Sequence, residues 1–286
     1  MMIRALCFLF ALLGLCGCSA LGVINGLTPS DTYLKTDGVA YGDDVRQRLD
    51  IYQPSTQSAA QTSALPVVVF FYGGSWNSGQ RSDYTFVGEA LAARGIVTVI
   101  ADYRIYPQVK YPGFVEDAAR AVAWTLRNIP RYGGDPKRVF VMGHSAGAYN
   151  AAMVALDARW LKVYQLTPQD LRGWIGLAGP YNFLPIENPA VKPIFFYPDT
   201  PLDSQPIQHA SAASPRAFLA AAQNDTTVNP QRNTAQLARQ LRSVGVVVTE
   251  RIYPDVSHGS LVGAFSVPLR GLAPVLSDVE NFVRGD

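Results

Sequence analysis

The pentapeptide Gly-His-Ser-Ala-Gly at 143–147 matches the pattern G-x-S-x-G, which places a serine on a sharp turn between a strand and a helix. Glycines flank such a serine because a Cβ atom at either position would clash. The pentapeptide by itself is a weak signal, and a plain glycine-rich turn is the alternative. Here it follows a strand-like run at 138–142 and precedes a helical pattern at 148–156, as the pattern requires. The sequence therefore predicts that Ser145 is a nucleophile.

A serine hydroxyl is a weak nucleophile at neutral pH and needs a base, which is usually a histidine. The chain has three histidines. His144 is next to the serine, where we expect its side chain to point away from the nucleophile. His209 lies in a proline-rich segment, where it could be a polar cap or a residue of the pocket. His258 follows the last predicted strand, and the chain order serine, acid, histidine requires a late histidine. We therefore expect His258 to be the base, with a lone surface histidine as the alternative.

The acid that orients His258 should follow a strand, so that both side chains reach the same edge of the sheet. Asp225 comes directly after a predicted strand at 217–222. Asp255 is too close to His258 along the chain to orient the imidazole ring easily. The other aspartates considered flank helical patterns or lie in the proline-rich segment: Asp157, Asp170, Asp199 and Asp203. We expect Asp225 to fix the tautomer of His258 and to stabilise its charged form, with a turn-capping aspartate as the alternative.

Attack on a carbonyl group also needs hydrogen-bond donors for the oxyanion that develops. The backbone N–H of Ala146, directly after the nucleophile, can supply one donor. The second is expected from the segment Tyr-Gly-Gly-Ser-Trp at 72–76, which follows an apolar run at 66–72. Tandem glycines let this backbone bend toward a substrate, and a simple glycine turn is the alternative.

The elements that must position these residues alternate along the chain, which is typical of βα units in a mostly parallel sheet. Apolar runs predict strands at 66–72, 96–102, 138–143, 173–178, 217–222 and 246–253. Helical patterns occupy 84–94, 115–127, 148–156 and 230–244. The segment 182–213 breaks this alternation with six prolines and an aromatic run at 195–197. We interpret it as an insertion over one end of the sheet that walls an apolar pocket.

Composition and charge exclude other classes of protein. The chain has 286 residues, a formal charge of +2 and 16% charged residues, which are too few for a disordered chain. Its lysines and arginines form no dense run, so nothing indicates a nucleic-acid partner.

All three cysteines, Cys7, Cys16 and Cys18, lie in the first 18 residues. Arg4 and the apolar run at 5–15 form the pattern of a secretory signal, and the run is too short to span a membrane. Removal of such a signal would leave no cysteine for a disulfide, a thiolate nucleophile or a zinc site, provided that the last cysteine is acylated.

Gly17 before Cys18 resembles the processing box of bacterial lipoproteins. We therefore expect a signal peptide at 1–17, a lipid-anchored Cys18, a tether at 18–36 and a single domain at 37–286. Ser19 resembles the residue found in lipoproteins that are sent to the outer membrane, so the expected location is the cell envelope. A secretion signal cut near Ala20 is the alternative.

Together these motifs resemble the α/β-hydrolase fold, in the esterase branch that includes hormone-sensitive-lipase-like carboxylesterases, kynurenine formamidases and feruloyl or acetyl-xylan esterases. The resemblance covers 41–284 and implies a mostly parallel, twisted sheet of about eight strands with helices on both faces. It rests, in the family's order, on 72–76, Asp-Tyr-Arg at 102–104, Tyr-Gly-Gly-Asp-Pro at 132–136, 143–147, Asp225 and His258.

The resemblance also implies roles for single residues. The implied oxyanion hole consists of Gly74, Ser75 and Ala146, with Gly73 shaping its loop, and the substrate pocket includes Trp76, His144 and Tyr181. Tyr72 is a departure, because the family usually has histidine there; we expect activity to survive with altered support of the loop. The long N-terminal helical cap of the lipase-like branch is also missing, which favours the formamidase and feruloyl-esterase side.

The expected activity is hydrolysis of a carboxylic ester with a short or medium acyl or an aryl group, through an acyl-enzyme and without a metal or organic cofactor. An N-formyl aryl amide hydrolase is one alternative. A non-catalytic envelope lipoprotein that uses the fold for binding is another. The expected partners are a small-molecule ester and a membrane reached through Cys18, whereas the acyl chain, the alcohol and the oligomeric state stay open.

Overall fold

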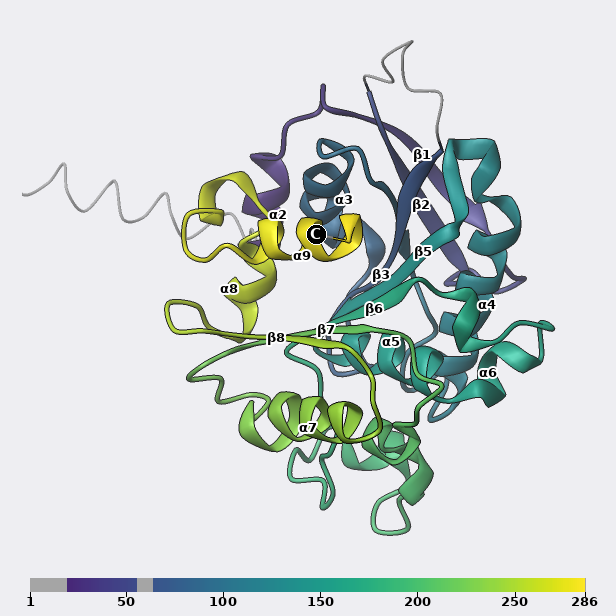
Figure 1. Ribbon diagram of the computed structural model, residues 1–286, viewed down its shortest axis with the longest axis vertical. Helices are drawn as coiled ribbons and strands as arrows, with labels where there is room; N and C mark the ends of the chain where they lie inside the picture. The colour runs from purple at the N-terminus through teal and green to yellow at the C-terminus, as the bar shows by residue number, and fades with distance from the viewer. Residues whose placement is uncertain (1–19, 56–63, 286) are drawn as a thin grey trace, which may run out of the picture.

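A sheet of eight strands in the order β1-β2-β4-β3-β5-β6-β7-β8 runs through the centre of the protein (Figure 1). The computed structural model describes residues 20–55 and 64–285, so the predicted signal peptide and Cys18 lie outside the described residues. The strands are β1 (Tyr33–Ala40), β2 (Arg48–Pro54), β3 (Leu65–Phe71), β4 (Val97–Ala101), β5 (Gly134–His144), β6 (Gly173–Leu177), β7 (Ala217–Ala222) and β8 (Val248–Tyr253). β3 to β8 pair in parallel, and β1 and β2 are antiparallel. The predicted mostly parallel sheet is confirmed.

The parallel strands are apolar throughout because both faces of the sheet are covered. Every residue of β3, β4, β6 and β7 is buried. Their continuous apolar runs, rather than an alternating pattern, made these strands predictable from the sequence.

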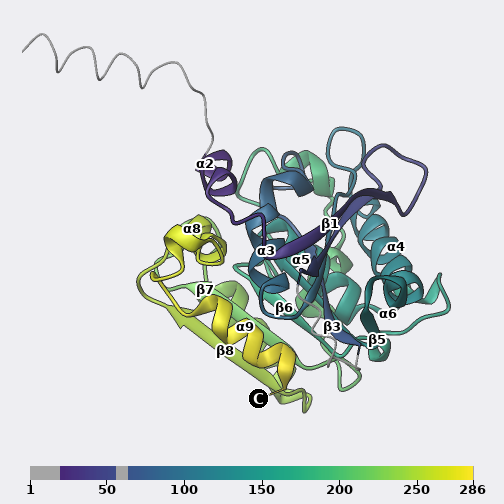
Figure 2. The ribbon, with the colours of Figure 1, turned by 90° about the horizontal axis from the view of Figure 1, so that it is seen from above.

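Helices cover both faces of the sheet, as predicted (Figure 1). One face carries α3 (Thr85–Ala92), α8 (His258–Gly263) and α9 (Val275–Arg284), and the other carries α4 (Gly113–Asn128), α5 (Ala146–Leu156), α6 (Ala158–Lys162) and α7 (Gln236–Ser243). Figure 2 separates α4 and α6 at one end of the molecule from α8 and α9 at the other.

Packing of these helices follows their apolar stripes. On α4, Val115, Ala118, Ala119 and Val122 are buried. On α9, the ring of Phe282 lies 5.9 Å from that of Phe140 in β5.

The structure differs from the sequence prediction at the helix after β7 and at the tether. The helix expected at 230–244 begins as a π-helical turn, Gln231–Ala235, and continues as α7. The tether expected at 18–36 is ordered in its described part: α2 (Ala20–Gly26) packs near α3, and β1 begins at Tyr33. The amide Nδ2 of Asn25 donates to the carbonyl of Ser82, 2.9 Å away, so this segment is held by contacts that its polar, turn-rich composition does not indicate.

The proline-rich segment 182–213 forms three short 3-10 helices, Lys192–Phe195, Leu202–Ser204 and Pro206–His209. It packs against α5, where the hydroxyl of Tyr149 donates to the carbonyl of Ser204 over 2.7 Å. The segment therefore lies near the carboxyl ends of the strands, beside the predicted nucleophile.

Within the ranges described, no helix combines the length and the apolar character needed to cross a membrane.

Candidate active site

Ser145 lies on a strained turn between β5 and α5, with φ 54° and ψ −122°. A non-glycine residue in such a conformation costs about 1–3 kcal/mol and persists only where surrounding contacts enforce it. A Cβ atom on Gly143 would lie 2.1 Å from the carbonyl oxygen of Gly147, and one on Gly147 would lie 2.0 Å from that of Phe71. The two glycines of the pentapeptide are therefore required by close backbone contacts around the serine.

The structure brings Ser145, His258 and Asp225 into one hydrogen-bonded chain. Nε2 of His258 lies 2.9 Å from Oγ of Ser145, and Nδ1 lies 2.7 Å from Oδ2 of Asp225. Because a carboxylate can only accept, Nδ1 carries the proton and Nε2 is left to accept from the serine hydroxyl. This is the proton arrangement that a serine nucleophile needs.

The carboxylate of Asp225 is fully buried. Burial acts to raise its pKa, but hydrogen bonds from His258 and from the backbone N–H groups of Val228 and Thr227 outweigh this effect and hold the pKa below its usual range. Those two N–H groups donate to Oδ1 over 2.9 and 2.8 Å. Asp225 therefore stays ionised beside the imidazole.

Two neighbouring parallel strands deliver the acid and the base to the same place. Asp225 follows β7, and His258 begins α8 after β8. Ser257 caps α8, since its hydroxyl accepts from the N–H of Ser260 over 3.3 Å. The carboxyl ends of parallel strands lie at one edge of the sheet, which explains how residues 33 positions apart meet.

His144 lies behind the predicted pocket rather than in it. Its side chain is buried and is not part of the cavity that contains Ser145. Nε2 of His144 is 2.9 Å from the backbone carbonyl oxygen of His258, so it must carry a proton and donate. Burial, together with the nearby His258, lowers the pKa of His144 to about 3 and keeps the ring neutral. The prediction of a substrate-pocket role is wrong, because the ring turns inward to hold the loop that carries His258.

The glycine-rich segment after β3 lies against the nucleophile. A Cβ atom on Gly73 would lie 3.0 Å from Cβ of Ser145. The next residues have positive φ angles, 131° at Gly74, 50° at Ser75 and 57° at Trp76. In the described part of the chain, the N–H groups of Gly74 and Ser75 have no hydrogen-bond acceptor. Successive free N–H groups of this kind form a concavity suited to an anion.

Ala146 is the first residue of α5. The first N–H groups of a helix have no partner within the helix. Its position next to Ser145 suits it to donate to the same anion.

Tyrosine rings support this segment in place of the family's histidine. Tyr72 stacks on Tyr103 with centroids 4.7 Å apart and on Tyr84 at 5.8 Å. The hydroxyl of Tyr103 donates to the carbonyl of Tyr72 over 2.7 Å, and Nη2 of Arg46 donates to the hydroxyl of Tyr72 over 2.8 Å. Tyr72 is therefore held by two ring stacks and by hydrogen bonds from Tyr103 and Arg46.

Trp76 lines the cavity that contains Ser145. Its Nε1 donates to Oδ1 of Asn150 on α5 over 3.2 Å, and its ring meets that of Phe195 edge-on at 4.9 Å. Asn150 was not predicted, because an asparagine inside a helix carries no signal of its partner.

The cavity that contains Ser145 has a volume of about 560 Å³. Its apolar wall comes from Phe183, Pro185, Ile186 and Val191, so the proline-rich segment does wall the pocket. The aromatic run at 195–197 does not line this cavity: Phe195 is buried with its ring 4.9 Å from that of Trp76, and Phe196 and Tyr197 are exposed.

Tyr181 was also predicted to line the pocket, but it is fully buried in the core. A Cβ atom on Gly176 would lie 1.9 Å from the hydroxyl oxygen of Tyr181, so the absent side chain provides the space for this ring.

His209 bonds to the backbone carbonyl of Asp203 over 2.7 Å and does not line the cavity.

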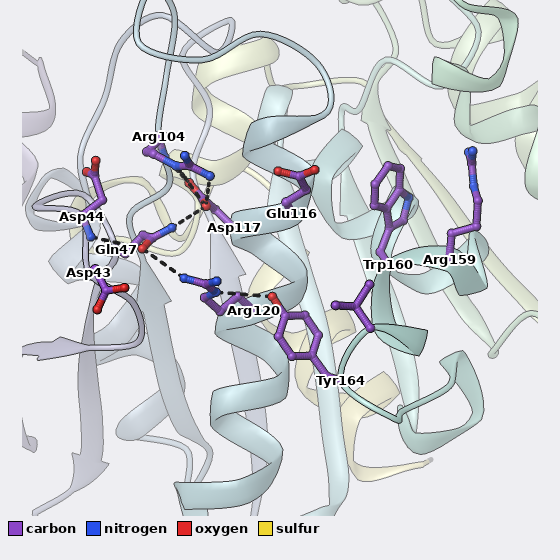
Figure 3. Close-up of a pocket in the computed structure, with 11 residues that line it drawn as sticks. Asp43, Asp44, Gln47, Arg104, Glu116, Asp117, Arg120, Arg159, Trp160 and Tyr164 are labelled. Atoms are coloured by element: carbon purple, nitrogen blue, oxygen red, sulfur yellow. Dashed lines mark hydrogen bonds and ion pairs between the residues drawn. The ribbon is translucent and has the colours of Figure 1, made fainter.

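A second cavity, of about 810 Å³, lies between the loop that joins β1 and β2, α4 and α6 (Figure 3). At its floor, Nη2 of Arg104 lies 2.7 Å from Oδ1 of Asp117, and Gln47 donates to the same oxygen over 2.7 Å. Arg104, the last residue of the Asp-Tyr-Arg motif, therefore joins the loop after β4 to α4. This cavity contains none of Ser145, His258 and Asp225, so we place the candidate active site in the smaller one.

No group of three or more histidine, cysteine, aspartate or glutamate side chains suited to a metal ion occurs among the residues that the structure describes.

Comparisons with known proteins show the family and the fold of the chain. The BD-FAE family model matches residues 49–241. The isoprenylcysteine alpha-carbonyl methylesterase of Arabidopsis thaliana is 30% identical over 254 residues, which are 82% of this chain and 58% of the plant protein. The kynurenine formamidase of Salmo salar is 27% identical over 230 residues, which are 78% of this chain and 74% of the fish protein. The solved structure of a truncated carbohydrate esterase from gut microbiota matches with a TM-score of 0.73 at 16% identity, covering 90% of this chain and 98% of that chain. The chain thus spans little more than half the length of its plant relative.

Proposed function

The chain belongs to the BD-FAE family and has the α/β-hydrolase fold, and from this premise we propose that it hydrolyses carboxylic esters with Ser145 as nucleophile, His258 as base and Asp225 as orienting acid. The observation that carries the proposal is the unbroken chain of contacts, 2.9 Å from Oγ to Nε2 and 2.7 Å from Nδ1 to the carboxylate. Relatives named as esterases add support.

In the proposed reaction, the hydroxyl proton of Ser145 moves to Nε2 of His258 as Oγ bonds to the ester carbonyl carbon. The carbonyl oxygen gains the electron pair and accepts hydrogen bonds from the N–H groups of Gly74, Ser75 and Ala146. The imidazolium then gives its proton to the alcohol oxygen as the C–O bond breaks, which leaves an acyl group on the serine. Water repeats the sequence on this acyl-enzyme and releases the acid.

Hydrolysis of an N-formyl aryl amide is a second candidate, supported by the relatives named kynurenine formamidase. The same residues would act, with an amine as the leaving group. Rates on N-formylkynurenine and on an aryl acetate, measured side by side, distinguish the two candidates.

Labelling with a fluorophosphonate probe tests the proposal directly, because only an activated serine reacts with it. We expect the label on Ser145, and we expect Ser145→Ala to lose both the label and at least about 10⁴-fold of p-nitrophenyl acetate turnover. A circular dichroism spectrum identical to that of the wild type would show that the variant is folded. An unlabelled but folded wild-type chain would favour the non-catalytic binding role, and undiminished turnover by the variant would overturn the mechanism.

We also propose that Cys18 carries a lipid that anchors the protein in the cell envelope, in the outer membrane as Ser19 suggests. The support is the order of a basic residue, an apolar run and Gly17 before the cysteine. Mass spectrometry of the mature N-terminus tests this: an acylated Cys18 supports the anchor, and an unmodified N-terminus near Ala20 contradicts it.

A further inference from the structure

The cavity that contains Ser145 holds two charged side chains that the proposed reaction does not use. Three charged residues line it, Asp225, Glu187 and Arg232. Asp225 is occupied by His258 and by two backbone N–H groups. Arg232 and Glu187 are therefore available to interact with a substrate.

The guanidinium of Arg232 is held in place by one hydrogen bond, but not all of its N–H groups have an acceptor. Arg232 belongs to the π-helical turn Gln231–Ala235, and its backbone N–H donates to Oδ1 of Asn229 over 2.9 Å. Its Nη2 donates to the backbone carbonyl of Leu184 in the proline-rich segment. In the described part of the chain, Nε has no hydrogen-bond acceptor, and Nη1 has only the carboxylate of Glu187 at 3.7 Å.

The contact with Glu187 is weak enough for a substrate to replace it. The side chain of Glu187 is 84% exposed, whereas that of Arg232 is 32% exposed. An exposed pair at this distance contributes little, because water screens both charges and the glutamate must lose side-chain freedom. A carboxylate that binds in the cavity would meet a guanidinium already fixed at one nitrogen, so less freedom is lost on binding.

The surroundings of Arg232 also strengthen an interaction with an anion. Phe183, Ile186 and Val228 line the same cavity and lower its local polarity. A guanidinium presents parallel N–H groups that match the two oxygens of a carboxylate. A substrate suited to these walls has an apolar segment that ends in a negative charge.

We propose that Arg232 selects ester substrates that carry a carboxylate on the group bound in this cavity, and that Glu187 limits this preference by repelling the same carboxylate. The inference rests on the proposed function, because it concerns substrates cleaved at Ser145. The competing explanation is that Arg232 has only a structural role, in which its hydrogen bond to Leu184 holds that loop against the π-helical turn.

Two pairs of matched esters test the proposal from the acyl side and from the alcohol side. The first pair is p-nitrophenyl butyrate and mono-p-nitrophenyl succinate, and the second is phenyl acetate and 4-acetoxybenzoate. The measured quantity is the ratio of kcat/KM for the anionic ester to that for the neutral one. We expect the wild type to favour the anionic member of at least one pair, with the preference falling as salt is added.

Arg232→Gln should lower that ratio roughly 10- to 100-fold, mainly through KM, because a hydrogen-bonded charge pair is lost. Glu187→Gln should raise the ratio, because it removes the repelling charge. Arg239→Gln is the matched control: Arg239 is exposed on α7, outside the cavity, so its variant changes the net charge equally and should leave the ratio as in the wild type.

If Arg232 only holds the loop around Leu184 in place, Arg232→Gln should slow hydrolysis of both members of a pair alike and leave the ratio of kcat/KM unchanged. That result, or a wild type without preference in either pair, overturns the proposal. If Arg232→Gln does not fold, Arg232→Lys keeps the charge without the planar geometry and should give an intermediate ratio. Failure of the proposed function looks different, because neither neutral ester would then be hydrolysed and Ser145 would not be labelled.

Discussion

Nε2 of His144 lies 2.9 Å from the backbone carbonyl oxygen of His258, so the residue next to the nucleophile holds the loop that carries the base. The two imidazole rings are 4.9 Å apart. Because His144 ends β5 and Ser145 begins the turn, one dipeptide positions both partners of the proton transfer. A shift of this strand end would move the nucleophile and the base together.

Replacing His144 by phenylalanine should slow catalysis. The ring would still fill much of the space, but the carbonyl of His258 would lose its donor, at a cost of about 1 kcal/mol or more. We expect kcat to fall roughly 10-fold, since a small displacement of His258 lengthens its contact with Ser145. His144→Gln can still donate an amide hydrogen and should recover most of the loss. A phenylalanine variant with wild-type kcat would show that the contact does not position the base.

The neutral state of His144 should appear in the pH dependence of stability. Its pKa is about 3 in the folded chain and 6.5 in the unfolded chain. Between these values the unfolded chain binds a proton that the folded chain does not, so acidification favours unfolding by at most about 1.4 kcal/mol per pH unit. His144→Gln removes this effect, and its free energy of unfolding should fall less steeply from pH 6.5 to pH 4. Urea unfolding at several pH values measures both slopes, and identical slopes would contradict a buried neutral histidine.

Asp225→Asn should abolish most activity while the protein stays folded. The amide oxygen can still accept from Thr227 and Val228, but its NH₂ group would face Nδ1 of His258. The proton would then reside on Nε2, which could no longer accept from the serine. A fall in kcat of about 10⁴-fold is expected. Asp255→Asn is the matched control, because Asp255 is exposed and precedes His258 by only three positions; a similar loss in that variant would argue against a special role for Asp225.

Changes at Tyr72 should separate ring stacking from hydrogen bonding in the support of the glycine-rich segment. Tyr72→Phe keeps the stack on Tyr103 and removes the hydroxyl, with its hydrogen bonds to Arg46 and Asp102. Arg46 still donates to the carbonyl of Gly79 over 2.7 Å. We expect a loss of about 1–2 kcal/mol in the free energy of unfolding and a small effect on kcat. Tyr72→Ala should cost about 3–5 kcal/mol and lower kcat further. Denaturant unfolding and ester turnover measure both, and equal losses of kcat in the two variants would assign the support to the hydroxyl.

The positions of the buried parallel strands could be predicted because each of them is a local apolar run, whereas no range was predicted for β1 and β2. The prediction at 217–222 coincides with β7, and the one at 173–178 exceeds β6 by a single residue. The ordered segment before β1 could not be predicted, because contacts such as that of Asn25 with Ser82 hold it, and these residues are distant in the sequence.

For the site, the sequence by itself determined the residue types at strand ends: a serine between two glycines after β5, an aspartate after β7 and a histidine after β8. Chain order limits which of them can meet, because parallel strands end at a common edge. Local patterns were sufficient for this part.

Only the tertiary structure decided which way the remaining side chains turn. His144 and Tyr181 face inward, whereas Arg232 joins the wall around Ser145. These outcomes depend on space left by residues elsewhere in the chain, such as the missing side chain of Gly176 beneath Tyr181. The spacing of residues in the sequence does not reveal that space, because it forms only when the helices pack against the sheet.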